Sequence, residues 1–203
     1  MKVAVFGLGY VGTVTAVALA RDGHEVVGVD PAIAKVEAIR AGRPPVTEPG
    51  LDRLTQSVVH DGRLRATGEA AEALAGAELS LVCVGTPSLE DGSLDLGAVR
   101  QVAAEIGALL PVAAAAHLVV VRSTVLPGST RGQVIPAVEQ ASGRRVGEGW
   151  DVAVNPEFLR EGSSLADYDA PSRILVGERR PGGGARVLTL YERVVGERVV
   201  VPL

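Results

Sequence analysis

Three glycines near the amino terminus have the spacing of a phosphate-binding turn. Gly7, Gly9 and Gly12 stand in VFGLGYVG, directly after an apolar run expected to be a strand and at the start of a segment with helical periodicity. Such glycines provide a tight turn, close approach of a pyrophosphate to the backbone and tight helix–strand packing. The N–H groups of the first helical turn, at Tyr10 and Val11, would then meet the pyrophosphate at the positive end of the helix dipole. The pattern predicts dinucleotide binding, with packing alone as the alternative role of the glycines.

An acidic residue follows the turn at the separation expected of a ribose ligand. Asp30 closes the next predicted strand, in EVVGVD. Its carboxylate should accept hydrogen bonds from the adenosine ribose hydroxyls and repel a 2′-phosphate, so NAD is favoured over NADP. Lys35, one turn into the following helix, weakens the predicted preference for NAD over NADP. It is either a solvated surface lysine or a contact on the ribose side of the cofactor.

The single cysteine is a candidate nucleophile only if its thiol is exposed. Cys83 lies within LSLVCVG, a run that reads as a strand buried on both faces. A free cysteine in such a position behaves as a small hydrophobic residue, and the low dielectric raises the pKa of its thiol. We therefore expect Cys83 to serve packing. His24, His60 and His117 have no carboxylate or serine partner suggested by the sequence, and we expect them at surface or boundary positions.

Composition narrows the functional class. Hydrophobic residues make up 47% of the 203 residues and aromatic residues only 3%, which predicts a close-packed aliphatic core. The formal net charge of -4 argues against a nucleic-acid-binding surface. One cysteine forms no internal disulfide, and no Cys and His spacing suggests a metal site, so we expect a reducing, cytoplasmic location. The sequence has neither a signal-peptide pattern nor an apolar run of about twenty residues, so no membrane association is expected.

Short β-branched runs alternate with Ala- and Leu-rich segments of helical spacing, which is typical of repeated strand–helix units. Strands are predicted at residues 2–7, 25–30, 79–85, 117–123, 151–155 and 173–178, with weaker candidates at 64–68 and 198–203. Helices are predicted at 10–21, 32–41, 51–59, 69–75, 96–110, 130–141 and 185–194, with Ser129 as the N-cap of the sixth. We expect one α/β domain over residues 1–203, a Rossmann-type, doubly wound, mainly parallel sheet with helices on both faces.

Four motifs together carry a resemblance to a known family. FGLGYVG, VCVGTPSLEDGSLDL, VVVRSTVLPGS and NPEFLREGSSLADYDAPSRILVG resemble, in register as far as about Glu178, the N-terminal NAD-binding half of the UDP-glucose/GDP-mannose dehydrogenase family. The sequences GTPS, DGSLDL and RSTVLPG are most similar to those of members that oxidise GDP-mannose, whereas EGSSLADYDAPSRILVG could equally belong to a UDP-glucose member. The resemblance implies oxidation of the C6 alcohol of a nucleotide sugar to a carboxylate, with two NAD and a cysteine-bound thioester.

The resemblance also implies roles for residues that follow the central strands. Thr86, with Pro87, would line the cofactor, and Thr124, with Ser123, would contact it and help to hold a water molecule. For a threonine at a strand end the plainer role is a hydroxyl that satisfies the backbone of a nearby loop.

The segment NPEFLRE is expected to border the substrate. The resemblance makes Glu157 an acid/base or water-orienting group, and it places Phe158, Leu159, Arg160 and Glu161 against the sugar nucleotide, with Glu161 also near the cofactor. If the segment is helical, Glu157 and Glu161 can face one side. The alternative is an ordinary helix start with carboxylates near its N-terminus.

The family's nucleophile lies in a Gly-Gly-x-Cys segment further downstream, and its partner lysine and asparagine lie on a long central helix. The chain stops at RVVVPL, about where that helix would begin, so we expect cofactor binding without turnover and dimerisation only in a full-length enzyme. Two other classes of protein share part of this pattern. A non-catalytic NAD-sensing regulatory domain explains the missing nucleophile but not STVLPG or NPEFLRE, and a β-hydroxyacid dehydrogenase, which needs no thiol, does not explain NPEFLREG.

Overall fold

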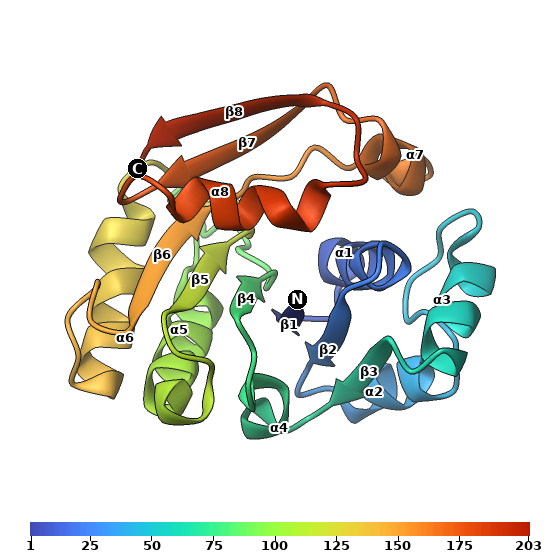
Figure 1. Cartoon of the computed structure of the whole chain (residues 1–203), viewed down its shortest axis with the longest axis horizontal. Helices are drawn as coiled ribbons and strands as arrows, with labels where there is room; N and C mark the ends of the chain where they lie inside the picture. The colour runs from blue at the N-terminus through green and yellow to red at the C-terminus, as the bar shows by residue number, and fades with distance from the viewer.

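The computed structural model describes residues 1–203 and contains a single eight-stranded sheet (Figure 1). The strands follow the order β3-β2-β1-β4-β5-β6-β7-β8, and all neighbours are parallel except β6 and β7. Their bounds are β1 (Lys2–Phe6), β2 (Glu25–Val29), β3 (Leu64–Thr67), β4 (Leu79–Val82), β5 (His117–Val121), β6 (Trp150–Val154), β7 (Arg173–Glu178) and β8 (Glu197–Pro202). The first six strands have the order of a Rossmann fold, so the predicted fold class is confirmed.

Helices cover both faces of the sheet (Figure 1). One face carries α1 (Tyr10–Arg21), α2 (Ile33–Arg40), α3 (Leu51–His60), α7 (Ser164–Asp169) and α8 (Gly183–Leu188). The other face carries α4 (Ala70–Leu74), α5 (Gly97–Leu109) and α6 (Ile135–Ser142). No helix of the structure is both long enough and apolar enough to cross a bilayer.

The core is divided into two layers by the sheet, because successive strand side chains point to opposite faces. Val3 and Val5 of β1 pack with α1, whereas Ala4 and Phe6 pack in the cluster that includes α4 and α5. All four side chains are at most 1% exposed. Burial on both faces explains why the central strands read as continuous apolar runs rather than as alternating patterns.

Most predicted elements are present, and the differences occur at their ends. Both weaker strand candidates form strands, as β3 and β8. The predicted helix 130–141 begins as a π-helical turn, Thr130–Val134, and becomes α-helical at Ile135. Pro136 explains the irregularity, because it lacks the N–H that a continuous α-helix would need there. Ser129 precedes this turn in a helical backbone conformation, and its hydroxyl caps nothing, so the predicted capping role is wrong.

Two further predictions of local structure need correction. The predicted helix 185–194 is α-helical only at Gly183–Leu188 and continues as a 3-10 turn at Thr189–Tyr191. Residues 155–160 are neither helix nor strand, so Glu157 and Glu161 do not share a helical face. The short helix α7, which follows this segment, was not predicted because six residues are too few to show a periodic pattern.

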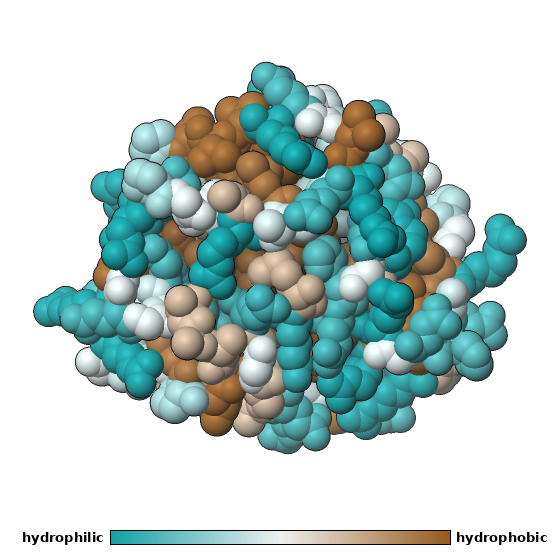
Figure 2. All heavy atoms as spheres, in the orientation of Figure 1, coloured by the Kyte–Doolittle hydropathy of each residue, from teal (hydrophilic) through white to brown (hydrophobic).

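The two edge strands of the sheet differ in exposure. β3 buries every residue except Arg65. In β8 only Val199 is even partly buried, and Val200 and Val201 are 41% and 40% exposed. Figure 2 shows apolar side chains gathered over β7 and β8 at the top of the view. On the face shown in Figure 2, the edge strand β8 therefore adds exposed apolar side chains to the surface.

His117 does not lie at the surface, contrary to the sequence-based expectation. It is the first residue of β5 and is fully buried. Its Nδ1 lies 2.8 Å from the carbonyl oxygen of Ala77, and its Nε2 lies 2.8 Å from Oγ of Ser80. A neutral imidazole protonated at Nδ1 donates to that carbonyl and accepts from the serine hydroxyl. Burial lowers the pKa of His117 to about 4, because the charged form loses its solvation.

This histidine should make folding stability depend on pH. Because the pKa of His117 is lower in the folded state than the usual 6.5, the unfolded chain takes up the proton first as the pH falls. We expect the stabilisation to be complete above pH ~6.5 and to be lost progressively towards pH ~4, by about 3 kcal/mol. Urea unfolding at a series of pH values measures this loss.

The variant His117→Gln should be less stable at neutral pH but should show a smaller fall on acidification. His60→Gln, at the exposed end of α3, controls for the loss of a histidine. Equal acid-dependent losses in the wild type and in His117→Gln would contradict this account.

Candidate cofactor and substrate site

A cleft of about 370 Å³ opens at the carboxyl ends of β1, β2 and β4. It lies at the point where the strand order reverses, between β1 and β4, which is where open α/β sheets bind ligands. Its lining combines the glycine turn with the ends of the neighbouring strands and one face of α5. The residues are Phe6, Gly7, Gly9, Val29, Asp30, Pro31, Lys35, Gly68, Cys83, Val84, Gly85, Ala98, Gln101, Val102 and Glu105.

The three glycines have different steric roles. A Cβ at Gly12 would lie 1.8 Å from the carbonyl oxygen of Gly7, and one at Gly7 would lie 2.9 Å from that of Cys83. Gly7 also has a φ of +96°, a conformation that side chains disfavour. These two glycines are therefore required by the packing of the protein itself. A Cβ at Gly9 meets nothing within 4 Å, so this position faces open space that a pyrophosphate can approach.

The N-terminus of α1 is left without a protein cap. Gly9 occupies the N-cap position and has no side chain, and the first turn contains no acidic residue. The Tyr10 and Val11 amides therefore begin a twelve-residue helix whose positive end no carboxylate of its own first turn neutralises. This end of the helix suits an anionic group.

Asp30 is buried and holds the turn together. Its Oδ2 accepts hydrogen bonds from the Leu8 amide at 2.8 Å and from Lys35 Nζ at 2.9 Å, and its Oδ1 accepts from the Ala32 amide at 2.9 Å. Burial alone would raise the pKa of Asp30, but the bonds from Lys35, Ala32 and Leu8 outweigh it and hold the pKa below its usual value. Lys35 is therefore not a free surface lysine, because it is ion-paired with Asp30.

The ends of β4 and β5 bring the two predicted threonines together. The Thr86 hydroxyl donates to the carbonyl oxygen of Thr124 at 2.7 Å, so it satisfies a neighbouring loop in this structure. The Ser123 hydroxyl donates to the Val84 carbonyl oxygen at 2.6 Å and is therefore engaged within the protein. Pro87 is exposed, and its carbonyl oxygen accepts from the Asp95 amide at 2.8 Å. The Thr124 side chain is exposed at this edge of the sheet.

Residues 157–161 form a loop whose amides are held by carboxylates. Oε2 of Glu157 accepts from the Leu159 amide at 2.6 Å. Asp167 accepts from the Arg160 amide at 2.9 Å and from its guanidinium at 2.6 Å, and the bonds from Arg160 lower the pKa of Asp167 to about 2. Phe158 is 51% exposed. Glu161 is also exposed and makes no side-chain hydrogen bond within the protein. The Arg160 charge is thus already paired, which the sequence did not indicate.

A buried arginine that sequence reasoning missed stands beside this loop. Arg122 is 5% exposed and donates to Thr15 Oγ1 at 3.1 Å, to Asn155 Oδ1 at 2.7 Å and to the Tyr191 hydroxyl at 3.0 Å. It forms no ion pair, and it lines a cavity of about 30 Å³ that Glu157 also lines. The available signal was a charged residue directly after the four apolar residues that end β5.

A second missed residue is Glu48, in the loop between α2 and α3. It is only 3% exposed, and its carboxylate accepts hydrogen bonds from residues far away in the sequence. Nothing in RPPVTEPG marks this glutamate, because its partners lie in other segments of the chain.

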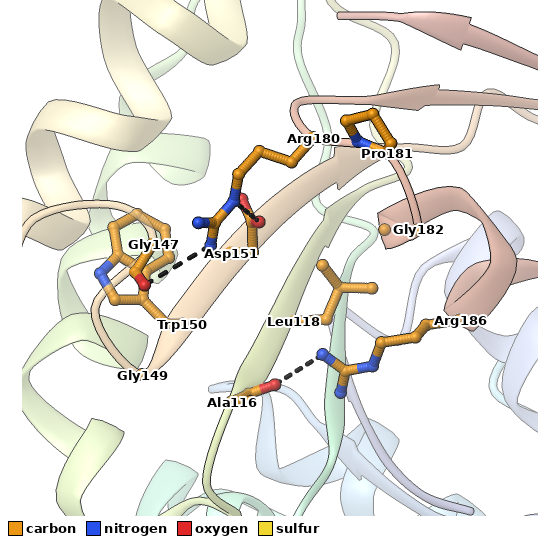
Figure 3. A pocket seen from close by; sticks show the side chains of 11 residues that line it. Ala116, Leu118, Gly147, Gly149, Trp150, Asp151, Arg180, Pro181, Gly182 and Arg186 are labelled. Atoms are coloured by element: carbon orange, nitrogen blue, oxygen red, sulfur yellow. Dashed lines mark hydrogen bonds and ion pairs between the residues drawn. The ribbon is translucent and has the colours of Figure 1, made fainter.

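The cavity in Figure 3 lies at the opposite, amino-terminal edge of β5 and β6. Arg180 Nε lies 3.0 Å from Asp151 Oδ2, and Arg186 Nη1 donates to the Ala116 carbonyl oxygen at 2.6 Å. These contacts fasten the turn between β7 and α8 to the starts of β5 and β6. The arginines are thus engaged in structural contacts. Across residues 1–203, no group of three or more His, Cys, Asp or Glu side chains could hold a metal ion.

The fold and the glycine turn define a dinucleotide-binding domain of the dehydrogenase type. A sequence model described as UDP-glucose/GDP-mannose dehydrogenase family, NAD binding domain, matches residues 1–195. The chain therefore belongs to the UDP-glucose/GDP-mannose dehydrogenase family, and its cofactor is NAD. Both conclusions confirm the expectations from the sequence.

Individual relatives agree with this assignment. A GDP-mannose 6-dehydrogenase of Pseudomonas syringae pv. syringae is 46% identical over 96% of this chain and 44% of its own length. A UDP-glucose 6-dehydrogenase of Haloferax volcanii is 43% identical over 87% of this chain and 41% of its own. The crystal structure of a ternary complex of GDP-mannose dehydrogenase from Pseudomonas aeruginosa superposes with a TM-score of 0.96 and 41% identity, covering 100% of this chain and 46% of that one. The chain thus spans less than half the length of these relatives.

Cys83 is buried, as predicted, and is 7% exposed. It follows the last residue of β4, with its amide bonded to the Phe6 carbonyl oxygen at 2.8 Å. Burial raises the pKa of its thiol to about 12; the nearby Arg122 lowers the pKa and Glu157 raises it by smaller amounts. The thiolate, which is the reactive form, is therefore scarce near neutral pH.

We expect Cys83 to resist alkylation in the folded protein. Iodoacetamide at mildly alkaline pH should leave the native chain unmodified, and in urea it should add one carbamidomethyl group, as read by intact mass. Cys83→Ser should show no addition in urea, which identifies the modified residue. Rapid modification of the native chain would show that the thiol is accessible and ionised.

Proposed function

We propose that this chain is the cofactor-binding part of an enzyme that oxidises the C6 alcohol of GDP-mannose to the carboxylate with two NAD. One observation carries the proposal: the motifs that resemble the dehydrogenase family lie together at one edge of the sheet. The glycine turn, Thr86, Thr124 and the loop 157–161 follow β1, β4, β5 and β6, whose carboxyl ends lie side by side. Cofactor and substrate residues therefore converge from distant parts of the chain.

The residues of the cleft fit a dinucleotide. Gly9 leaves space at the uncapped start of α1, so we assign the pyrophosphate to the Tyr10 and Val11 amides. Asp30 stands at the end of β2, where we assign it to a ribose hydroxyl. NAD held by these residues would supply the hydride acceptor for oxidation of the alcohol carbon.

The chain also supplies groups that can move a proton. The hydrogen bond from the Leu159 amide fixes Oε2 of Glu157. The other carboxylate oxygen, Oε1, has no donor within the protein. We propose that Glu157 accepts a proton or orients a water, with Thr124 as a second hydrogen-bonding group for that water. Thr124 keeps its own hydroxyl available, since Thr86 bonds to its backbone carbonyl.

GDP-mannose is preferred to UDP-glucose on the basis of the relatives. GDP-mannose 6-dehydrogenases reach 46% identity over 96% of the chain, whereas the UDP-glucose 6-dehydrogenases of Haloferax volcanii and Rhizobium meliloti reach 43% and 40% over shorter spans. The difference is small, and UDP-glucose is therefore the alternative substrate.

Titration with each nucleotide sugar tests the substrate. With NAD present, we expect GDP-mannose to shift the backbone amide resonances of residues 157–161 more strongly than UDP-glucose at equal concentration. The chain alone should nevertheless form no carboxylate product, because the thioester of the second oxidation needs a nucleophilic thiol and the only thiol of the chain is buried. A larger response to UDP-glucose would reverse the preference, and steady formation of the carboxylate would contradict the cysteine argument.

Asp30 should control the choice of cofactor. In Asp30→Asn the side chain keeps an acceptor for the Leu8 amide but loses the charge that repels a 2′-phosphate. We expect about tenfold weaker NAD binding, from the loss of a charged hydrogen bond, together with a smaller preference over NADP. Calorimetry with both cofactors measures the two effects. Unchanged NAD affinity in Asp30→Asn would remove the role assigned to this residue.

A further inference from the structure

Glu48 connects three segments of the chain that are distant in sequence. Its Oε2 accepts hydrogen bonds from the Tyr10 hydroxyl and from the Gly162 amide, the latter at 2.8 Å. Its Oε1 accepts from the Ser164 amide, also at 2.8 Å. A single carboxylate therefore joins the loop before α3, the start of α1 and the turn that leads into α7.

The bonds to Glu48 are required by its burial. The side chain forms no ion pair, and burial alone would raise its pKa, but the bonds from Tyr10, Gly162 and Ser164 outweigh this effect and hold the pKa of Glu48 below its usual value. A buried carboxylate that lost one of these donors would be left partly unsatisfied, which is costly. The three donors and the carboxylate thus favour a single arrangement.

The donors belong to the two halves of the proposed site. Tyr10 is the first residue of α1, whose N-terminus we assign to the pyrophosphate. Gly162 and Ser164 directly follow the loop 157–161, which we assign to the nucleotide sugar. The Tyr10 hydroxyl also lies 3.5 Å from the Arg160 carbonyl oxygen, so the phenol reaches the substrate loop itself.

Other carboxylates hold the loop only locally. Glu157 accepts a hydrogen bond from the amide of Leu159, two residues away, and Asp167 accepts one from the amide of Arg160, seven residues away. Among the carboxylates that bond to residues 157–164, only Glu48 also contacts α1. Fixing the first turn of α1 should therefore restrict residues 162–164 through Glu48, in the way that rigidifying one site reduces motion at a coupled site.

We propose that Glu48 is a positioning residue that couples occupation of the cofactor helix to the ordering of residues 157–164. The consequence for nucleotide-sugar binding rests on the proposed function, because that function takes residues 157–161 to border the sugar nucleotide. Coupling to the amides of residues 162 and 164 rests only on NAD binding at α1.

Amide hydrogen exchange with and without saturating NAD tests the coupling. In the wild type, NAD should slow exchange at residues 9–12 and also, about tenfold, at residues 162 and 164. In Glu48→Gln, NAD should still slow exchange at 9–12 but should no longer do so at residue 164. The amide NH2 must face either the Ser164 amide, which then loses its acceptor, or the Tyr10 and Gly162 donors, which breaks the connection to α1. Glu37→Gln, which removes an exposed carboxylate from α2, should behave like the wild type.

Tyr10→Phe separates coupling from a merely structural role. It removes the hydroxyl through which α1 bonds to Glu48 and leaves Glu48 bonded to the Gly162 and Ser164 amides. We expect these amides to stay protected in the free protein but to lose their response to NAD. A structural role predicts instead that the ratio of exchange rates with and without NAD is the same in all variants. That result would overturn the proposal, and so would the absence of any effect of NAD on exchange at residues 162 and 164 of the wild type. If Glu48→Gln does not fold, Tyr10→Phe alone tests the proposal.

Nucleotide-sugar affinity then separates this inference from the proposed function. NAD should tighten GDP-mannose binding to the wild type by about fivefold, and the enhancement should disappear in both variants. If the wild type binds neither GDP-mannose nor UDP-glucose, the proposed function fails, while the exchange measurement still decides the role of Glu48.

Discussion

The close contact between α1 and the turn that precedes it is the constraint on which the cofactor cleft depends. A Cβ at Gly12 would lie 1.8 Å from the Gly7 carbonyl oxygen and 3.2 Å from the Cβ of Cys83. Any side chain at residue 12 would therefore push α1 away from β1 and β4 and move its first turn out of line with the cleft. The small side chain of Cys83 serves the same contact, so its burial belongs to the construction of the site rather than to its chemistry.

Features encoded by short-range spacing could be predicted from the sequence. Gly7, Gly9, Gly12 and Asp30 lie within one strand–helix–strand unit. The structure places Gly7, Gly9 and Asp30 in the lining of one cleft and packs Gly12 against the Gly7 carbonyl oxygen. The contacts of Glu48 join residues 114 and 116 positions apart, and no local pattern reports such distances. The helix α7 was missed because it is too short to show a periodic pattern, and the carboxylate that binds the amides at its start is the distant Glu48. His117 was misplaced because its acceptor and donor partners became neighbours only through the pairing of β4 and β5.

Two buried charged groups near the site, Arg122 and Glu48, are balanced by hydrogen bonds rather than by opposite charges. Arg122 has three neutral acceptors in different elements, and Glu48 has neutral donors in two segments. The loss of any one of these hydrogen bonds would leave a buried polar group unsatisfied, which is costly. The bonds contribute mainly by fixing the relative positions of the elements that they join. Other carboxylates form ion pairs: Asp30 pairs with Lys35 in the cleft, and Asp151 pairs with Arg179 and Arg180 at the amino-terminal edge of the sheet.

The bonds already made by Asp30 limit how it can recognise a ribose. An ionised carboxylate accepts about four hydrogen bonds, and three are used by the Leu8 amide, the Ala32 amide and Lys35. Oδ2 takes two of these and Oδ1 only one, so the position that is left for a ribose hydroxyl lies on Oδ1. The Lys35 charge, 2.9 Å from Oδ2, also reduces the repulsion that Asp30 exerts on a 2′-phosphate. The charge of Asp30 therefore discriminates between the two cofactors less strongly than an unpaired carboxylate would, and the remaining acceptor position on Oδ1 adds to the preference for an unphosphorylated ribose.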